Sequence, residues 1–146
     1  MYETEDPGGM TGAGFYRFVP DDPEHLTAGG TLDMLKIKGH PNADLRENQE
    51  PGVPLTVRWV GIEDPDPTLP NIAGPGSTFN QGWAKGGAKF FRLEGCWADG
   101  STIYFVSTGG GDEKHSPLSR TASGGATARS GPTAPATATT MTGRSR

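Results

Sequence analysis

Glycine and proline divide the first 115 residues into short runs, and this punctuation constrains the fold more than any other sequence feature. The chain holds 23 glycines and 13 prolines in 146 residues. No stretch shows the 3.6-residue apolar period of a long amphipathic helix. The runs between the breaks are rich in β-branched and aromatic residues, which favour strands. Short strands at regular spacing are typical of all-β proteins, so we expect an all-β fold, with a sandwich, a barrel and propeller blades all open.

Six segments carry the strand pattern. They are residues 1–5, 14–19, 30–37, 56–60, a run around Phe90, and 102–108. In the third, the period of two predicts that Leu32, Met34 and Lys36 share one face and that Leu35 and Ile37 lie on the other. Residues 65–76 contain four prolines and predict a long loop. Residues 80–88 are compatible with a short helix, although their glycines favour a turn.

The sequence changes character after His115. Residues 116–146 lack Val, Ile, Phe, Trp, Tyr, Asp and Glu, and four arginines give them a formal charge of +4. Residues 1–115 hold nine Lys or Arg against 17 Asp or Glu, a charge of −8. A segment that buries so little apolar area cannot offset its chain entropy. We therefore expect a domain fragment over residues 1–115 and a disordered tail over 116–146, whose composition is also typical of GC-rich DNA translated out of frame.

Composition argues against several classes of partner. The four arginines of the tail are scattered and have no aromatic residues between them, so we expect no nucleic-acid binding. No apolar run approaches transmembrane length, and the acidic N-terminus has no secretory signal. We expect no membrane partner, no specific protein partner, and a chain that stays in the compartment where it is made. Cys96 is the only cysteine, and its apolar neighbours favour a small buried side chain.

Arg92 and Glu94 form the first candidate site. They are two residues apart, so an extended segment places both side chains, with Phe90, on one face. Asp99-Gly100 then suits a tight hairpin turn before the strand 102–108. A cation beside an anion on an exposed face suits a metal ion and an anionic substrate, because an arginine fork matches phosphate oxygens. An inconsequential ion pair is the simpler interpretation of the spacing alone.

Two acidic clusters are the other candidates. Glu3, Glu5 and Asp6 precede a glycine turn, and calcium takes six to eight oxygen ligands of this kind. An acidic strand end facing water is the simpler interpretation of these residues alone. For the second cluster, at residues 63, 64 and 66, we favour a solvated loop. The three histidines are scattered, and neither a serine-hydrolase elbow nor a phosphate-binding loop motif is present.

The motifs TEDPGG, FYRFVP, FFRLEG and IYFVST-x-GG, in this order, resemble the DUF839 family of PhoX-type alkaline phosphatases. The resemblance spans about Tyr2 to Lys114. It implies a β-propeller fold, hydrolysis of phosphate monoesters, and a cofactor cluster of calcium and iron. It also implies export by the twin-arginine route, which the family usually follows.

Carried over residue by residue, the resemblance implies that Glu94 is a metal ligand and that Arg92 contacts the phosphate. Glu5 and Asp6 are implied as further acidic metal ligands. Cys96 does not match the iron-binding cysteine of the family, which lies in a tryptophan-rich segment upstream of TED. The chain therefore resembles an interior fragment, and we expect it to be inactive alone. The alternative is a non-catalytic β-propeller fragment that binds calcium or a partner.

Overall fold

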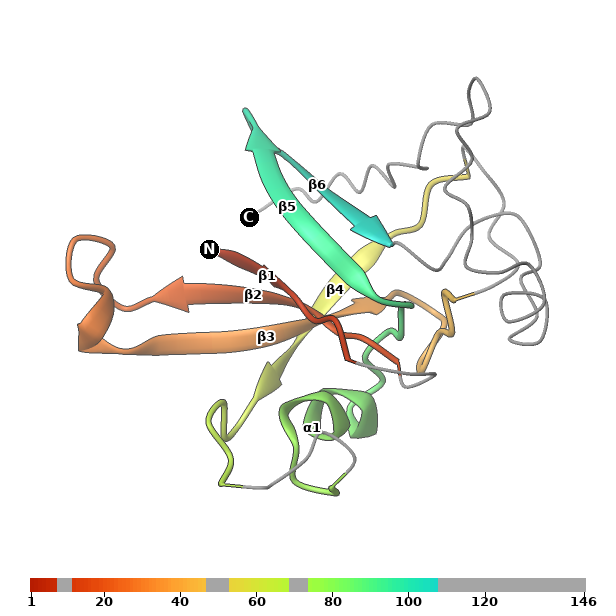
Figure 1. Cartoon of the computed structure of the whole chain (residues 1–146), viewed down its shortest axis with the longest axis horizontal. Coiled ribbons are helices and arrows are strands. Elements are labelled where there is room, and N and C mark those ends of the chain that lie inside the picture. Colours follow the sequence, from red (N-terminus) through yellow and green to blue (C-terminus); the bar gives the residue numbers. More distant parts are fainter. Residues whose placement is uncertain (8–11, 47–52, 69–73, 108–146) are drawn as a thin grey trace, which may run out of the picture.

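Two antiparallel sheets and one short α-helix make up the computed structural model, which describes residues 1–7, 12–46, 53–68 and 74–107 (Figure 1). The four-stranded sheet has the spatial order β1 (Tyr2–Thr4), β2 (Phe15–Pro20), β3 (Gly30–Ile37), β4 (Val57–Ile62). A second sheet is the hairpin of β5 (Leu93–Asp99) and β6 (Thr102–Ser107). Helix α1 (Thr78–Ala84) lies between β4 and β5 in the chain, and a 3-10 turn, Leu26–Ala28, joins β2 to β3.

The strand predictions agree with the structure in their coarse form, because strands are the predominant regular structure of the described residues. The segment in which the sequence allowed a helix or a turn, residues 80–88, overlaps α1, which begins two residues earlier and ends at Ala84. The hairpin turn is Gly100-Ser101, with Asp99 still paired to Thr102 as the last residue of β5. The two sheets form no closed barrel, so the propeller-like arrangement stays a prediction. The predicted tail, 116–146, lies outside the described residues.

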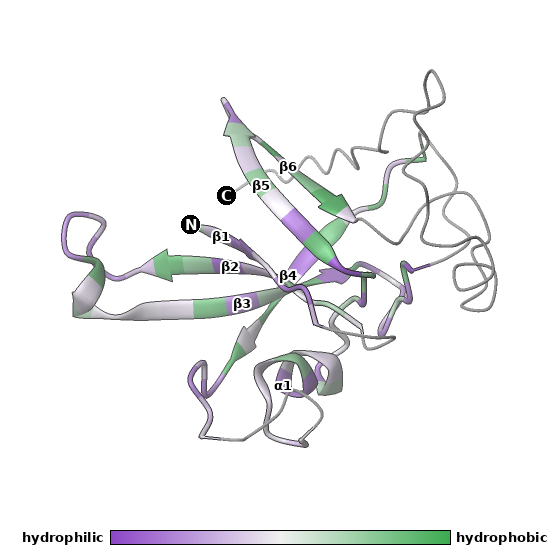
Figure 2. Cartoon of the chain, in the orientation of Figure 1, coloured by the Kyte–Doolittle hydropathy of each residue, from purple (hydrophilic) through white to green (hydrophobic). Residues whose placement is uncertain are grey.

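Side-chain alternation gives the four-stranded sheet a core on each face. One face packs against the hairpin. The core between them contains the buried residues Ala13, Phe15, Leu35, Ile37, Ala88, Phe90, Leu93 and Phe105. The other face packs against α1 through Tyr16, Met34 and Ile62, with Leu32, Val60 and Phe79 beside them. The predicted faces of residues 30–37 are thereby confirmed. Figure 2 shows hydrophobic residues alternating with polar ones along these strands.

Stacked aromatic rings attach the hairpin to the sheet. The ring of Phe105 in β6 lies 4.2 Å from that of Phe15 in β2, and 5.5 Å from that of Phe90 in an edge-to-face arrangement. Both geometries are favourable for aromatic pairs. The base of the hairpin is therefore fixed against the four-stranded sheet.

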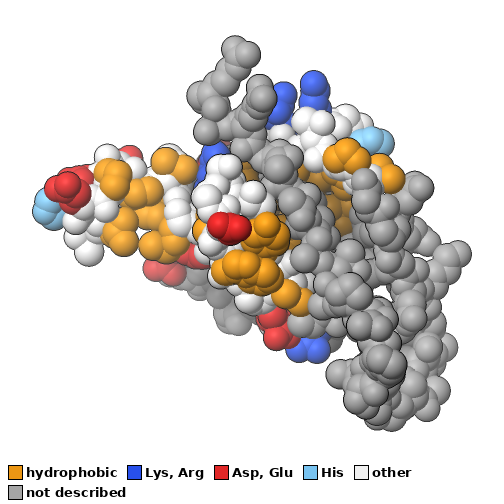
Figure 3. Space-filling view, turned by 90° about the horizontal axis from the view of Figure 1, so that it is seen from above, with side chains coloured by type: hydrophobic (Ala, Val, Ile, Leu, Met, Phe, Trp, Pro, Cys, Tyr) orange, Lys and Arg blue, Asp and Glu red, His pale blue; other side chains and the backbone are white. Residues whose placement is uncertain are grey.

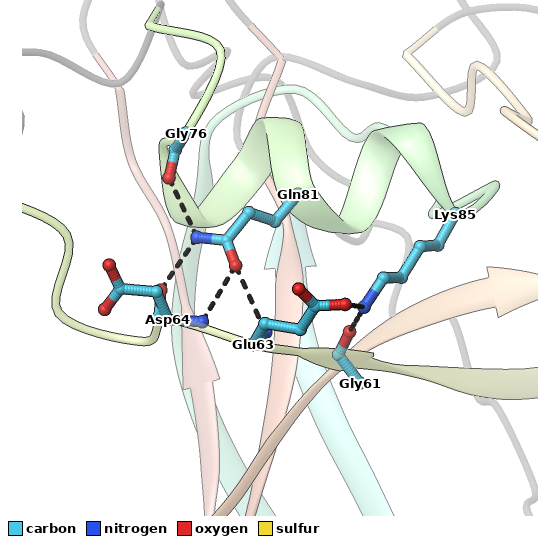
Figure 4. Close-up of polar contacts among 6 residues, drawn as sticks. All are labelled: Gly61, Glu63, Asp64, Gly76, Gln81 and Lys85. Atoms are coloured by element: carbon cyan, nitrogen blue, oxygen red, sulfur yellow. Dashed lines mark hydrogen bonds and ion pairs between the residues drawn. The ribbon is translucent and has the colours of Figure 1, made fainter.

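Helix α1 is held against β4 by side-chain contacts to the backbone (Figure 4). Gln81 Oε1 accepts hydrogen bonds from the backbone N–H groups of Glu63 (3.1 Å) and Asp64 (2.9 Å), and its Nε2 donates to Asp64 and Gly76 carbonyls. Lys85 Nζ donates to the Gly61 carbonyl and pairs with Glu63 at 3.0 Å. The acidic loop at 63–66 is exposed, as predicted.

Glycine at position 82 permits the close contact between α1 and β3. A Cβ there would overlap the side chain of Met34, so a larger residue would push the helix off the sheet. The glycine that argued against a helix is therefore required for the packing of this one. Within the described residues, no helix is long and apolar enough to cross a membrane.

Candidate functional site

Three of the four predicted site residues meet at the base of the hairpin. Arg92 donates from Nε to Asp6 Oδ1 at 3.0 Å and from Nη2 to Asp6 Oδ2 at 3.3 Å. The same Nη2 donates to Glu94 Oε1 at 3.2 Å. The fork of the guanidinium thus holds Asp6 with two hydrogen bonds and Glu94 with one. Each of the three side chains is 37–46% exposed, so the cluster is open to solvent.

Arg92 reaches this position through an irregular backbone. Its φ is 47°, in the left-handed region that residues with a Cβ rarely adopt, and it precedes β5 rather than lying in it. Phe91 and Leu93 on either side are both buried, and so is Phe90. The prediction that Phe90, Arg92 and Glu94 share one face of an extended strand is therefore wrong. Arg92 and Glu94 meet because the chain turns between the buried phenylalanines and β5.

Asp6 is brought to the cluster by the end of β1. The N–H of Leu93 donates to the carbonyl of Glu5 at 3.1 Å, which joins the two segments next to the site. The hydrogen bond from Arg92 lowers the pKa of Asp6, and Asp6 in turn raises the pKa of Arg92. Both groups are charged at neutral pH, so Asp6 and Arg92 form an ion pair, and Glu94 pairs with the same guanidinium.

Glu5 is oriented differently from its neighbour Asp6. Its Oε2 accepts hydrogen bonds from the Gly14 N–H (2.7 Å) and the Tyr16 hydroxyl (3.1 Å). Gly14 directly precedes β2, and Tyr16 lies in it. Burial raises the pKa of Glu5, and these two hydrogen bonds offset part of the effect. Burial, followed by the nearby Glu5 charge, raises the pKa of Tyr16. The structure thus places Asp6 against Arg92, whereas the described contacts of Glu5 are with Gly14 and Tyr16.

The cluster contains carboxylate oxygens, which are suitable ligands for a hard cation. Asp6 and Glu94 already accept hydrogen bonds from one guanidinium, and carboxylate oxygens are the ligands that calcium prefers. Within the described ranges, no three His, Cys, Asp or Glu side chains group closely enough to hold a metal ion. The described cluster therefore supplies two carboxylates that could face a hard cation but no complete ligand set.

Cys96 cannot add a thiolate to this cluster. It is paired with Phe105, whose side chain faces the core, whereas Glu94 is paired with Val106 on the opposite face. Cys96 is also exposed, so the prediction that it is buried is wrong. Partial desolvation raises the pKa of its thiol, which keeps the thiol protonated at neutral pH.

The sequence patterns missed two features of this region. One is the partnership of Tyr16 with Glu5, which depends on how β1 pairs with β2. The other is a stacked pair, Trp97 and Tyr104, with ring centroids 5.2 Å apart on the hairpin. Cross-strand register decides both contacts, and a single sequence does not contain it.

Comparison with known proteins gives one match. The model of the family described as alkaline phosphatase PhoX matches residues 1–142, and this range includes most of the predicted tail. No curated protein and no solved structure matches the chain. Because the family model covers nearly the whole sequence, this chain belongs to the PhoX alkaline phosphatase family.

Proposed function

We propose that this chain contributes the phosphate-binding edge of a metal-dependent phosphatase that hydrolyses phosphate monoesters. The observation that carries the proposal is the convergence of Arg92, Asp6 and Glu94 at the hairpin base, in a member of the PhoX family. Arg92 and Asp6 are 86 positions apart in sequence. Their pairing is therefore a product of the fold rather than of local sequence.

Each residue has a distinct role in this proposal. Arg92 presents a planar fork that matches two phosphate oxygens. Asp6 holds the guanidinium in place through two hydrogen bonds, and Glu94 offers a carboxylate to a cation beside the phosphate. A bound cation would supply positive charge next to a phosphoryl oxygen. Glu5 is retained as a further acidic ligand only as a prediction, because its described contacts are with Gly14 and Tyr16.

Calcium and iron are the proposed cofactors. The described cluster supplies two carboxylates, whereas calcium takes six to eight oxygen ligands, so further ligands are needed for tight binding. We therefore expect the chain by itself to bind cations weakly and to show no phosphatase activity above blank with iron and calcium added. The propeller-like arrangement is part of the same proposal. The two antiparallel sheets support it only in that the fold is built mainly from strands.

Calorimetric titration of calcium and then inorganic phosphate into the purified chain tests these roles. We expect Glu94→Gln to weaken calcium binding on the order of tenfold, because it removes a charged ligand. Arg92→Lys should leave calcium binding unchanged and weaken phosphate binding by a similar factor, because the planar fork is lost. Glu24→Gln, at an exposed position in the β2–β3 connection, is the matched control and should change neither.

The outcomes separate the proposal from its alternative. Calcium binding that depends on Glu94, without any phosphate binding, would instead indicate a non-catalytic module that binds calcium. Phosphate binding that is indifferent to both substitutions would remove Arg92 and Glu94 from the site. Turnover of a phosphate monoester by the purified chain, abolished by a chelator, would contradict our expectation that the chain is inactive alone.

A further inference from the structure

Trp97 and Tyr104 form an exposed aromatic pair on the hairpin. Their rings are stacked, with centroids 5.2 Å apart and planes within 10° of parallel. Trp97 is nevertheless 48% exposed, which is unusual for so large an apolar side chain. Seen from above, with the hairpin toward the viewer, hydrophobic side chains gather at the centre of the molecule with acidic and basic ones close by (Figure 3). The hairpin thus carries an apolar surface that the described core does not cover.

A β-bulge at Gly95 turns Trp97 onto the face that carries Glu94. In a regular strand, residues three apart point to opposite faces. Here Glu94 pairs with Val106 and Cys96 pairs with Phe105, so Gly95 is an extra residue without a partner. Its φ of 59° is the left-handed conformation that suits glycine at such a bulge. Trp97 is therefore on the same face as Glu94 because of the bulge.

The register also fixes the spacing between the two groups. Their cross-strand partners, Val106 and Tyr104, are two residues apart on β6, which corresponds to about 7 Å along the strand. The aromatic pair is thus the next residue pair after Glu94 on this face. The buried side chain of Phe105 lies between them on the opposite face. A phosphate ester held at Arg92 and Glu94 would extend along this face toward Trp97.

We propose that Trp97, supported by Tyr104, is a platform for the leaving group of the substrate, and that it favours phosphate monoesters whose leaving group is a planar ring. This inference rests on the phosphatase function proposed above. An aromatic ring stacked on Trp97 gains apolar contact, and Tyr104 keeps the indole in its orientation through the stack. An aliphatic leaving group such as glycerol gains much less. Trp97 is then a specificity-determining residue rather than a catalytic one.

Binding of two monoesters to the purified chain tests the platform without requiring turnover. In calorimetric titrations with calcium present, we expect phenyl phosphate to bind more tightly than glycerol 3-phosphate. Trp97→Leu should weaken phenyl phosphate binding about fivefold, the scale of one aromatic contact, and leave glycerol 3-phosphate unchanged. Trp97→Phe retains a ring and should restore most of the difference. Trp83→Leu, at a tryptophan stacked on Phe79 in α1, is the matched control and should alter neither ester.

The failures of the two proposals are distinguishable. If Trp97→Leu weakens the binding of both esters equally, or of neither, the proposed platform is wrong. The phosphate site would still stand in that case if Arg92→Lys weakens the binding of both esters. If phenyl phosphate binding depends on Trp97 but not on Arg92, the platform stands and the proposed role of Arg92 is wrong. If neither ester binds at millimolar concentration, the phosphate site fails and the platform fails with it.

Discussion

Replacing Tyr16 with phenylalanine isolates the hydrogen bond that holds Glu5. Tyr16 is 5% exposed, and its ring packs against α1 with Met34 and Ile62, so phenylalanine keeps the apolar contacts. The change removes one hydroxyl, which lies 3.1 Å from Glu5 Oε2. Because the Gly14 N–H still donates to the same oxygen, the carboxylate keeps one partner. The variant therefore measures a single hydrogen bond to a partly buried charge.

The expected loss in the free energy of unfolding at pH 7 is about 1–2 kcal/mol. Hydrogen bonds to charged groups contribute about 1.5–3 kcal/mol, and the remaining Gly14 donor and the partial exposure of Glu5 place the value at the lower end. The loss should be smaller at about pH 3.5, where glutamate is protonated and a neutral hydrogen bond contributes about 0.5–1.5 kcal/mol. The loss should therefore grow as the pH rises through the pKa of Glu5.

Urea denaturation at the two pH values, followed by tryptophan fluorescence, provides the measurement. The slope of the transition should stay unchanged, so that the shift in midpoint reports stability alone. Tyr104→Phe is the control, since this tyrosine lies partly exposed on the hairpin, and its cost should stay within about 0.5 kcal/mol. A cost for Tyr16→Phe that is the same at both pH values would show that the hydroxyl does not bind the Glu5 carboxylate.

Two further predictions concern the residues that flank the cluster. Burial raises the pKa of Glu5, so the parent chain loses stability as the pH rises through that pKa. Glu5→Gln does not titrate and keeps an oxygen acceptor, and in the same urea assay it should be more stable than the parent at pH 7 but not at about pH 3.5. The second concerns Arg92, whose left-handed backbone penalises any residue with a Cβ. Arg92→Gly should melt roughly 5 °C above Arg92→Ala in thermal unfolding, and equal melting temperatures would argue against the strained φ.

The regular strands were the most predictable part of this fold. Residues 30–37 alternate between two apolar faces, and the structure confirms both the bounds of β3 and the faces of Met34 and Leu35. Alternation identified this strand because each of its faces is covered by another element. Helix α1 was less predictable, because Gly82 lowers helix propensity while the contact with Met34 requires it. Tertiary packing, which the local sequence does not contain, decided that segment.

The candidate site was predicted in part. Arg92 and Glu94 were paired from their spacing, and the structure confirms that they meet, although through a turn rather than a shared strand face. Asp6 was included as part of an acidic cluster and by family resemblance, and the fold brings it to Arg92 across 86 positions. Glu5 and Asp6 are adjacent in sequence, and yet the two side chains have different partners. Burial and hydrogen bonding also shift their pKa values in opposite directions.

The proposed site depends on two backbone irregularities that lie three residues apart. At Arg92, a left-handed φ brings the guanidinium out of the buried run Phe90–Leu93 and toward Asp6. At Gly95, the bulge reverses the facing of every later residue of β5, which moves Trp97 to the side of Glu94 and Cys96 to the side of the core. An uninterrupted strand over residues 90–99 would have put Trp97 and Glu94 on opposite faces, with no common surface for one ligand. Departures from regular geometry of this kind recur next to functional sites, since a regular strand offers no way to re-aim one side chain alone. Arg92 and Gly95 explain why the period of two predicted a strand near Phe90 but assigned the wrong faces to its residues. They also make residues 92–97, where the backbone is irregular, the best candidate for a functional site.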